Sequence, residues 1–160
     1  MDYPEGYLAL TASAHRVLKD QGILIMRFFV QPKECEKLQD VFRDLNAGRI
    51  GNFHVFKWRL AMALQENTRC GVRMDDIWRA WKGAGIDKDS LMLMMGWRED
   101  VINTIAQYYG KDTRLSFPAL EEVQTTFSDY FEEIAMYIPR YELGERCPTL
   151  IFLKRPAGNT

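Results

Sequence analysis

The sequence predicts an α/β fold that carries a large helical insertion. Three observations predict it: the chain opens with a helix, a strand and a helix, its middle has helical periodicity, and it closes with two strands. The chain has 160 residues, of which 47% are hydrophobic, and this is enough for one ordinary core. We therefore expect a single domain over residues 1–160, with the insertion at about 51–110.

The opening elements follow from apolar spacing and from the residues that interrupt it. Apolar residues recur at helical spacing over residues 7–19, which predicts a first helix. The next run, residues 23–30, is apolar without alternation and lies between Gly22 and Pro32, which indicates a central strand buried on both faces. A second helix is expected over residues 32–45, because Pro is tolerated in a first turn.

Glycine residues divide the middle of the chain into helical segments. All four tryptophans lie in this region, and the helices are expected at residues 53–66, 75–82, 89–95 and 97–109. A further helix is expected to begin near Pro118 and to end near Asp129. The strands expected at residues 131–141 and 149–155 are separated by a polar connection long enough to turn the chain back, so the last strand pairs antiparallel.

The charge balance and the cysteines argue against several classes of protein. Twenty-one basic and twenty-two acidic residues leave a net charge of -1 without a basic cluster, so neither nucleic acid nor a membrane surface is an expected partner. The apolar runs are shorter than the ~20 residues that span a bilayer, and the first residues do not resemble a signal peptide. Three scattered cysteines predict no metal site and no disulfide framework. We therefore expect a cytoplasmic protein.

Two segments at opposite ends of the chain carry a resemblance. Residues 15–25 (HRVLKDQGILI) resemble the methyltransferase pattern in which a helix ends in RVLKPGG and a central strand follows; Asp20 and Gln21 replace Pro and Gly, whereas Gly22 is kept. Residues 117–123 (FPALEEV), 131–134 (FEEI) and 141–152 resemble the end of the same family, which closes with a helix and an antiparallel strand pair. The family is that of the class I, Rossmann-like, S-adenosylmethionine-dependent methyltransferases.

The resemblance implies a partial Rossmann-like sheet, made of one central strand and the antiparallel strand pair. In the family, the strands and the GxGxG loop that bind the cofactor precede this point, and the chain contains no GxGxG. We therefore expect the carboxy-terminal, substrate-side part of a methyltransferase, with the amino-terminal cofactor-binding half absent. The complete family member would use S-adenosylmethionine, whereas this chain alone is expected to bind none and to be inactive.

Candidate site residues follow from the resemblance and from the strand end. Tyr3 and Tyr7 fall where the family's loop passes the methionine end of the cofactor, so the resemblance implies that they line it; a helix-initiating turn with surface tyrosines is the alternative. Arg27 leaves the carboxyl end of the predicted central strand, where open α/β sheets bind ligands, and is a candidate contact to the methyl acceptor. A structural carboxylate that holds Arg27 is equally compatible with the sequence.

The helical middle offers a second group of candidates. His54 and Lys57 lie one turn apart beside Phe53 and Trp58, so His54 is a candidate base over an aromatic acceptor pocket that the other three residues line. A structural histidine is the simpler interpretation. A further set could shape an adaptable apolar pocket, although plain packing of helices is the simpler interpretation: Trp78, Trp81, Met92, Met94 and Met95.

Two functions remain open at this stage. The first is methyl transfer to a small-molecule acceptor, performed by a longer polypeptide of which this chain is a piece. The second is a non-catalytic methyltransferase remnant whose helical insertion binds a partner or forms a homodimer. The loss of the neighbouring strands would leave one edge of the central strand open to association unless something covers it. We favour the incomplete piece as the origin of the chain. The acceptor atom, whether oxygen, nitrogen or carbon, is not indicated by any motif.

Overall fold

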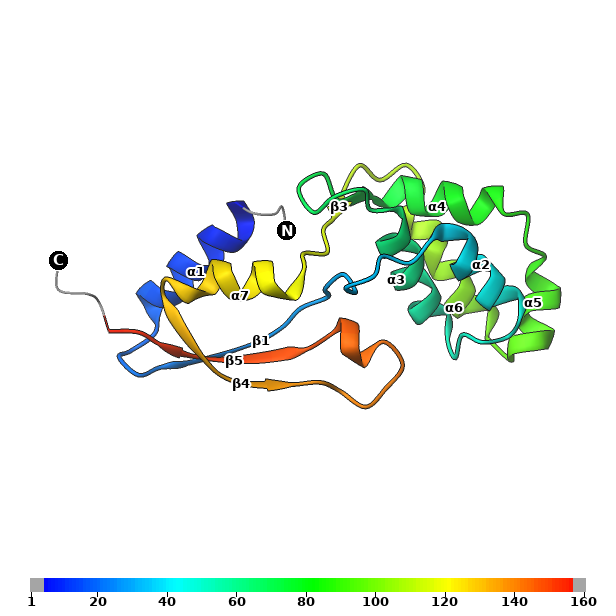
Figure 1. Cartoon of the computed structure of the whole chain (residues 1–160). Coiled ribbons are helices and arrows are strands. Elements are labelled where there is room, and N and C mark those ends of the chain that lie inside the picture. Colours follow the sequence, from blue (N-terminus) through cyan, green and yellow to red (C-terminus); the bar gives the residue numbers. More distant parts are fainter. Residues whose placement is uncertain (1–4, 157–160) are drawn as a thin grey trace. The chain divides into compact units, whose positions relative to one another are not determined.

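A computed structural model describes residues 5–156, and it has a mixed α/β fold with a small antiparallel sheet. The chain divides into two compact units, coloured along the sequence in Figure 1. Unit 1 contains residues 1–33 and 117–160, so it is built from both ends of the chain, and unit 2 contains residues 34–116. The sequence placed a helical insertion at about 51–110 in one domain, whereas the compact helical unit extends further in both directions.

Unit 1 is a three-stranded sheet with two helices. In chain order its elements are α1 (Glu5–Val17), β1 (Ile23–Arg27), α7 (Leu120–Ser128), β4 (Phe131–Tyr137), the 3-10 helix η2 (Gly144–Arg146) and β5 (Thr149–Lys154). The strand order is β1-β5-β4, and β5 runs antiparallel to both neighbours. The antiparallel pairing expected for the last strand is therefore confirmed. Because both outer strands oppose β5, β1 and β4 run parallel to each other.

The interpretation of residues 23–30 as a central strand buried on both faces is wrong for the described residues. Strand β1 ends at Arg27 and lies at an edge of the sheet, where it pairs only with β5. Ile23 and Ile25 are 54% and 63% exposed, while Leu24 and Met26 pack against the core on the opposite face. Strand formers in an unbroken apolar run do not specify how many neighbours a strand has, so the sequence overestimated the burial.

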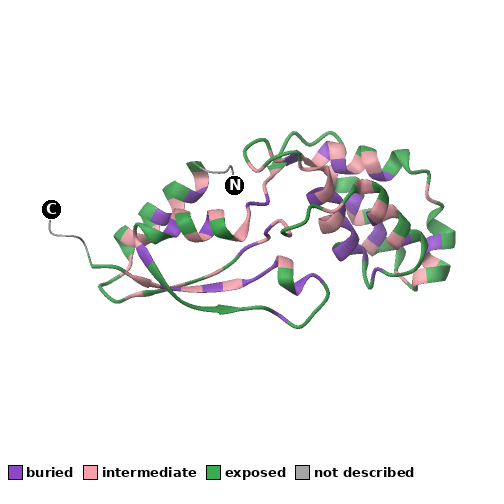
Figure 2. Cartoon of the chain, in the orientation of Figure 1, coloured by how far each residue is buried: buried purple, intermediate pink, exposed green. Residues whose placement is uncertain are grey.

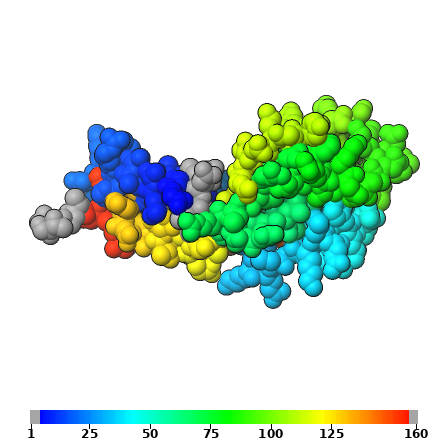
Figure 3. Space-filling model, turned by 90° about the horizontal axis from the view of Figure 1, so that it is seen from above, coloured from blue at the N-terminus to red at the C-terminus, as the bar shows by residue number. Residues whose placement is uncertain are grey.

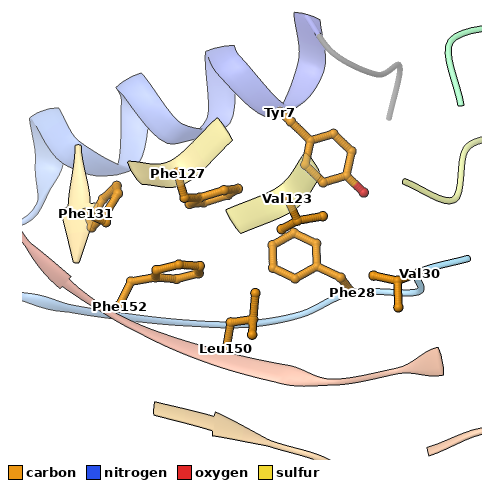
Figure 4. Packing of buried hydrophobic residues seen from close by; sticks show 8 residues of the cluster. All are labelled: Tyr7, Phe28, Val30, Val123, Phe127, Phe131, Leu150 and Phe152. Atoms are coloured by element: carbon orange, nitrogen blue, oxygen red, sulfur yellow. The ribbon is translucent and has the colours of Figure 1, made fainter. Parts of the chain in front are cut away.

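The core of unit 1 lies between the helices and one face of the sheet. Figure 4 shows Phe28, directly after β1, meeting aromatic side chains from α1, α7, β4 and β5 in this layer. The Phe127 and Phe152 rings are stacked at 4.9 Å between centroids, and Phe28 contacts Phe127 edge-on at 5.6 Å. Helices α1 and α7 lie side by side over the sheet (Figures 1 and 3). Aromatic pairs of this geometry contribute beyond their buried area.

One tight turn in unit 1 depends on a glycine. After β4 the chain returns through η2 to β5, and Gly144 there donates its N–H to Tyr141 O at 2.8 Å. A Cβ atom at Gly144 would lie 1.9 Å from the carbonyl oxygen of Pro139, so no larger residue fits without moving the backbone. The polar connection expected between the last two strands is therefore an ordered turn.

Unit 2 is helical apart from one short strand pair. Its helices are α2 (Leu38–Asn46), α3 (Phe53–Leu64), α4 (Met74–Gly83), α5 (Lys88–Met95), α6 (Glu99–Asn103) and the 3-10 helix η1 (Thr104–Tyr108). Strands β2 (Val72–Arg73) and β3 (Arg114–Leu115) pair antiparallel, whereas the sequence predicted only helices from residue 51 to residue 109. A strand of two residues is too short to show an alternating pattern.

The ends of the helices in unit 2 follow local chemistry. Asn52 caps α3 by accepting from Val55 N at 3.0 Å, and Asp87 caps α5 by accepting from Ser90 N at 3.0 Å. Helix α5 ends at Gly96, whose φ of 67° is left-handed. The second helix begins at Leu38 rather than near Pro32, and the segment expected at 97–109 is split into α6 and η1.

An ion-pair network and an aromatic cluster hold α2, α3 and α4 together. The Arg59 side chain is 12% exposed; it binds Glu36 and donates to Asp44 at 2.6 Å. Burial opposes charge on Arg59, but the two carboxylates outweigh this cost and raise the pKa of its guanidinium. Trp81 contacts Phe53 and Phe56 edge-on at 5.4 and 5.5 Å. Figure 2 shows the buried residues gathered on the inner faces of these helices.

Candidate functional site

The carboxyl ends of the parallel strands β1 and β4 lie at the same end of the sheet in unit 1, on either side of β5. Arg27 ends β1 there and is exposed, and its Nε donates to Thr149 Oγ1 at 3.3 Å. Tyr137 ends β4 and lies opposite Thr149 in the pairing register. Within residues 5–156 Arg27 forms no ion pair with a carboxylate, so its other N–H groups remain available to a ligand. The predicted role of Arg27 as an acceptor contact stays a prediction.

Tyr141 adds a second phenol group, after that of Tyr137, at this end of the sheet. Desolvation, followed by a hydrogen bond with Cys147, raises the pKa of Tyr141, while the positive charge of Arg27 acts in the opposite direction. Cys147 is buried and carries a free thiol. This end of the sheet therefore presents the Arg27 cation and two phenol groups, a set that can hydrogen-bond a carboxylate or hydroxyl group of a ligand.

The two tyrosines that the resemblance assigned to the cofactor have different outcomes. Tyr3 lies outside the described residues. Tyr7 is 8% exposed, and its ring stacks on Phe28 at 5.8 Å between centroids in the core of unit 1. Figure 4 shows this side chain among the core aromatics. Tyr7 is therefore not the surface tyrosine of the simpler interpretation, and its ring is occupied in packing.

The four candidates on α3 do not share one environment. Phe53 is completely buried, with its ring against Phe56, Trp81 and Trp97, and Trp58 is half-buried. His54 is exposed, whereas Lys57 is only 8% exposed. Spacing of one turn places His54 and Lys57 near each other in sequence, but their positions on the helix put one toward solvent and the other toward the core. A pocket with His54 as base over these three residues is not formed.

Lys57 is a buried cation without a carboxylate partner among the described residues. Its Nζ donates to Thr104 Oγ1 at 2.8 Å and lies 5.4 Å from the Tyr108 ring centroid and 5.9 Å from that of Phe53. Burial lowers the pKa of Lys57 and raises the pKa of Tyr108. The aromatic faces offset part of the cost of burying the ammonium group. Lys57 therefore connects α3 to η1 inside unit 2.

The candidate ligand site of unit 2 is a cavity of about 650 Å³. One wall is α4, which contributes Trp78, Trp81 and Lys82 at the i, i+3, i+4 spacing of one helix face. The loop 85–87, the start of α5 at Lys88 and Asp89, and four residues of α6 and η1 complete the lining: Ile102, Asn103, Ile105 and Ala106. This volume lies in the range of sites for small organic ligands.

The sequence anticipated the tryptophans of this cavity but not its polar residues. Trp78 and Trp81 line it, whereas Met92, Met94 and Met95 do not. Lys82 and Asp89, on α4 and α5, were not singled out, because an isolated charge on a helix carries no pattern. The signal that could have found Lys82 is its place on the same helix face as the two tryptophans.

Comparison with protein-family models, curated proteins and solved structures gives no match. Within residues 5–156 no three His, Cys, Asp or Glu side chains lie close enough together to hold a metal ion. In the same part of the chain, every helix is too short or too polar to cross a membrane.

Proposed function

We propose that the chain is the carboxy-terminal, substrate-side part of an S-adenosylmethionine-dependent methyltransferase of the Rossmann-like class. The observation that carries the proposal is the topology of unit 1: α1 leads into β1, α7 leads into β4, and β5 lies antiparallel between the two strands. This order of helix, strand, helix and antiparallel strand pair is in keeping with the pattern that residues 15–25 and 117–152 resemble, although β1 is an edge strand in the described sheet. Its compartment would be the cytoplasm, in keeping with three free cysteines.

The connection between β1 and β4 supports the assignment to the substrate side. Parallel strands require a crossover, and here the crossover contains all of unit 2 followed by α7. Unit 2 therefore enters the chain directly after the carboxyl end of β1. Open α/β sheets bind ligands outside the carboxyl ends of their strands, so the chain leaves β1 for unit 2 at the end of the sheet where an acceptor is expected.

The described residues do not fit the cofactor itself. S-adenosylmethionine would require a glycine-rich loop between a strand and a helix, where the backbone approaches the ligand. Within residues 5–156, β1 leads into Phe28, Phe29 and Val30, and the glycines with positive φ are Gly48, Gly71, Gly85, Gly96 and Gly110, none of which follows a strand of the main sheet. We therefore assign the residues of this chain to the acceptor alone.

For the acceptor, the residues of unit 1 supply orientation. Methyl transfer needs two reactants aligned at close range, which a fixed cationic contact can provide. Thr149 holds the Arg27 side chain at one nitrogen, and the remaining N–H groups of the guanidinium can bind a carboxylate or hydroxyl oxygen. Arg27 is in this proposal a positioning contact, and the acceptor is a small molecule.

The coding sequence directly upstream of Met1 tests the proposal. We expect an in-frame strand, a GxGxG loop and an acidic strand end, and we expect the polypeptide that includes them to bind S-adenosylmethionine in calorimetry. In that polypeptide Arg27→Ala should lower kcat/KM by about 10-fold without changing cofactor affinity. Arg16→Ala, which changes an exposed arginine on α1, is the matched control.

Two results would contradict the proposal. Micromolar binding of S-adenosylmethionine by the 160-residue chain alone would overturn our assignment of its residues to the acceptor. An upstream sequence without the strand and the loop would remove the methyltransferase assignment and leave the second candidate function.

The second candidate is a non-catalytic module that associates with a second copy of the chain. The observation in its favour is the uncovered face of the sheet, where Ile25 is 63% exposed, Tyr137 57% and Ile134 48%. Among the described residues the outer edge of β1 is also unpaired, and such an edge is a template for another strand. In an antiparallel β1 pair centred on Ile25, the two Arg27 side chains lie at opposite ends, so symmetry brings no like charges together.

Light scattering of the purified chain distinguishes the two candidates. The association module predicts a dimer that Ile25→Lys converts to a monomer, because a charge at the pairing centre opposes its symmetry mate. Leu93→Lys, at a side chain of α5 that is 90% exposed and lies outside the sheet, is the control for a general gain in solubility. A monomer at every concentration would exclude the module.

A further inference from the structure

The cavity of unit 2 combines an aromatic wall with unpaired charges of both signs. Trp81 is 7% exposed, and its packed side rests on Phe53 and Phe56. Within residues 5–156 its indole N–H has no hydrogen-bond acceptor, yet it is not one of the buried polar atoms without a partner. Trp81 lines the cavity and uses its indole N–H in no hydrogen bond with a described residue, so a ligand there can contact its ring.

Some of the charged groups in the lining are already used by the protein. Lys88 Nζ donates to Asn103 Oδ1 at 2.7 Å, and Asp87 accepts from Ser90 N at 3.0 Å and from Ser90 Oγ at 2.5 Å. The capping bonds lower the pKa of Asp87 and keep its carboxylate ionised. Hydrogen bonds within the protein therefore hold three polar side chains of the lining in place: Asp87, Lys88 and Asn103.

Two further charged residues of the lining, Lys82 and Asp89, are not held by such hydrogen bonds. Both line the cavity, both are exposed, and neither makes a side-chain hydrogen bond or an ion pair with a described residue. With Asp87 and Lys88 they give the lining two positive and two negative side chains. A ligand with only one sign of charge would meet repulsion from half of them, whereas a zwitterion can satisfy Lys82 and Asp89 together.

We propose that this cavity binds a small aromatic zwitterion of the amino-acid type. The ring of the ligand would lie against Trp78 and Trp81, its carboxylate would pair with Lys82, and its ammonium group would pair with Asp89. The cavity volume of about 650 Å³ accommodates a molecule of this size. The inference stands on unit 2 alone and does not require methyl transfer, so it and the proposed function fail separately.

Calorimetry on the full chain with four probes tests the inference. The probes are L-tryptophan, indole-3-acetate without the amine, tryptamine without the carboxylate, and L-leucine without the ring. We expect L-tryptophan to bind and each of the other three to bind at least about fivefold more weakly, since each loses one contact. If no probe binds with a Kd below about 1 mM, the inference is overturned.

Two substitutions assign the charges through crossed effects. Lys82→Ala should weaken the binding of L-tryptophan about fivefold and leave the affinity for tryptamine unchanged, because tryptamine has no carboxylate for Lys82 to bind. Asp89→Asn should weaken the binding of L-tryptophan and leave the affinity for indole-3-acetate unchanged, because indole-3-acetate has no amine for Asp89 to bind. Lys111→Ala, which changes an exposed lysine outside the cavity, should have no effect. Binding of L-tryptophan that survives both cavity substitutions would overturn the assignment.

Trp81→Phe tests the aromatic wall separately from the charges. The variant keeps a ring against Phe53 and Phe56 but loses the indole N–H, so we expect all three indole probes to weaken together. The tryptophan emission and melting curve of the variant establish that unit 2 is folded. Equal weakening of L-leucine would show that the wall acts on any ligand and would contradict recognition of a ring.

Discussion

Unit 1 and unit 2 bury their apolar residues in different ways. Of the large hydrophobic side chains that are exposed within residues 5–156, Leu93, Met94 and Tyr109 lie in unit 2, and the others lie in unit 1. In unit 1 the two helices cover one face of a sheet and leave the other face open (Figures 1 and 2). In unit 2 the helices surround their own core and a cavity.

The difference suggests a division of roles. An open apolar sheet face with an unpaired edge is typical of a surface that another polypeptide covers. A self-contained helical unit with a polar-lined cavity is instead suited to a small ligand. The association module uses the open face of unit 1, the methyltransferase proposal uses Arg27 of unit 1 to position an acceptor, and the ligand inference uses unit 2. Because each unit has its own core, we expect the two units to unfold independently.

Phe127→Ala should produce the largest effect and should act on unit 1. Phe127 is fully buried and contacts Phe28, Phe131 and Phe152, so its truncation should lower the free energy of unfolding by about 4 kcal/mol. Hydrogen exchange of peptides from residues 117–156 measures the loss. Val17→Ala, at a side chain 70% exposed, should change stability by less than about 0.5 kcal/mol.

The same variant tests the separation of the units. All four tryptophans lie in unit 2, so tryptophan emission reports on unit 2 alone. We expect the emission transition of Phe127→Ala to match that of the unchanged protein. If the emission transition shifts as much as the stability of unit 1, the two units unfold as one, and their separation is contradicted.

Arg59→Leu should have the next largest effect and should act on unit 2. The substitution leaves Glu36 and Asp44 without their shared cation, and breaking such a largely buried network costs about 3 kcal/mol. Denaturant unfolding followed by tryptophan emission measures it. Arg98→Leu removes the pair with Asp100, whose two side chains are 79% and 63% exposed, and should cost less than about 1 kcal/mol. Equal losses in both variants would contradict the structural role of Arg59.

Acid should produce a smaller, graded loss that is confined to unit 2. Hydrogen bonds from Arg59 and Arg49 lower the pKa of Asp44 from 3.8 to about 2. Because the folded pKa lies below the unfolded one, this stabilisation is complete above about pH 4 and is lost as the pH falls toward 2. Asp75, whose pKa is lowered first by the Gly110 N–H, acts in the same direction. Tryptophan emission against pH should show the loss, and Asp44→Asn should reduce it.

The candidate sites show where sequence reasoning reached its limit. The helix face that carries Trp78 and Trp81 was visible as a pattern, and the cavity uses it. His54 and Lys57 also formed a pattern, but which of them faces the core depends on the helices packed against α3. Asp89 lies in a polar segment where any charged residue would have looked the same, so its place in the cavity was not visible.

The sequence by itself determined the order of the elements in unit 1 and most helices of unit 2. Apolar spacing marks α1, α3 and α4, and the left-handed glycines Gly48 and Gly96 follow the ends of α2 and α5, because these signals act within a few residues. Only the tertiary structure decided that β1 is an edge strand, that Lys57 is buried, and that both chain ends form one unit. Strand neighbours and burial depend on residues far apart in the chain, which no local pattern records.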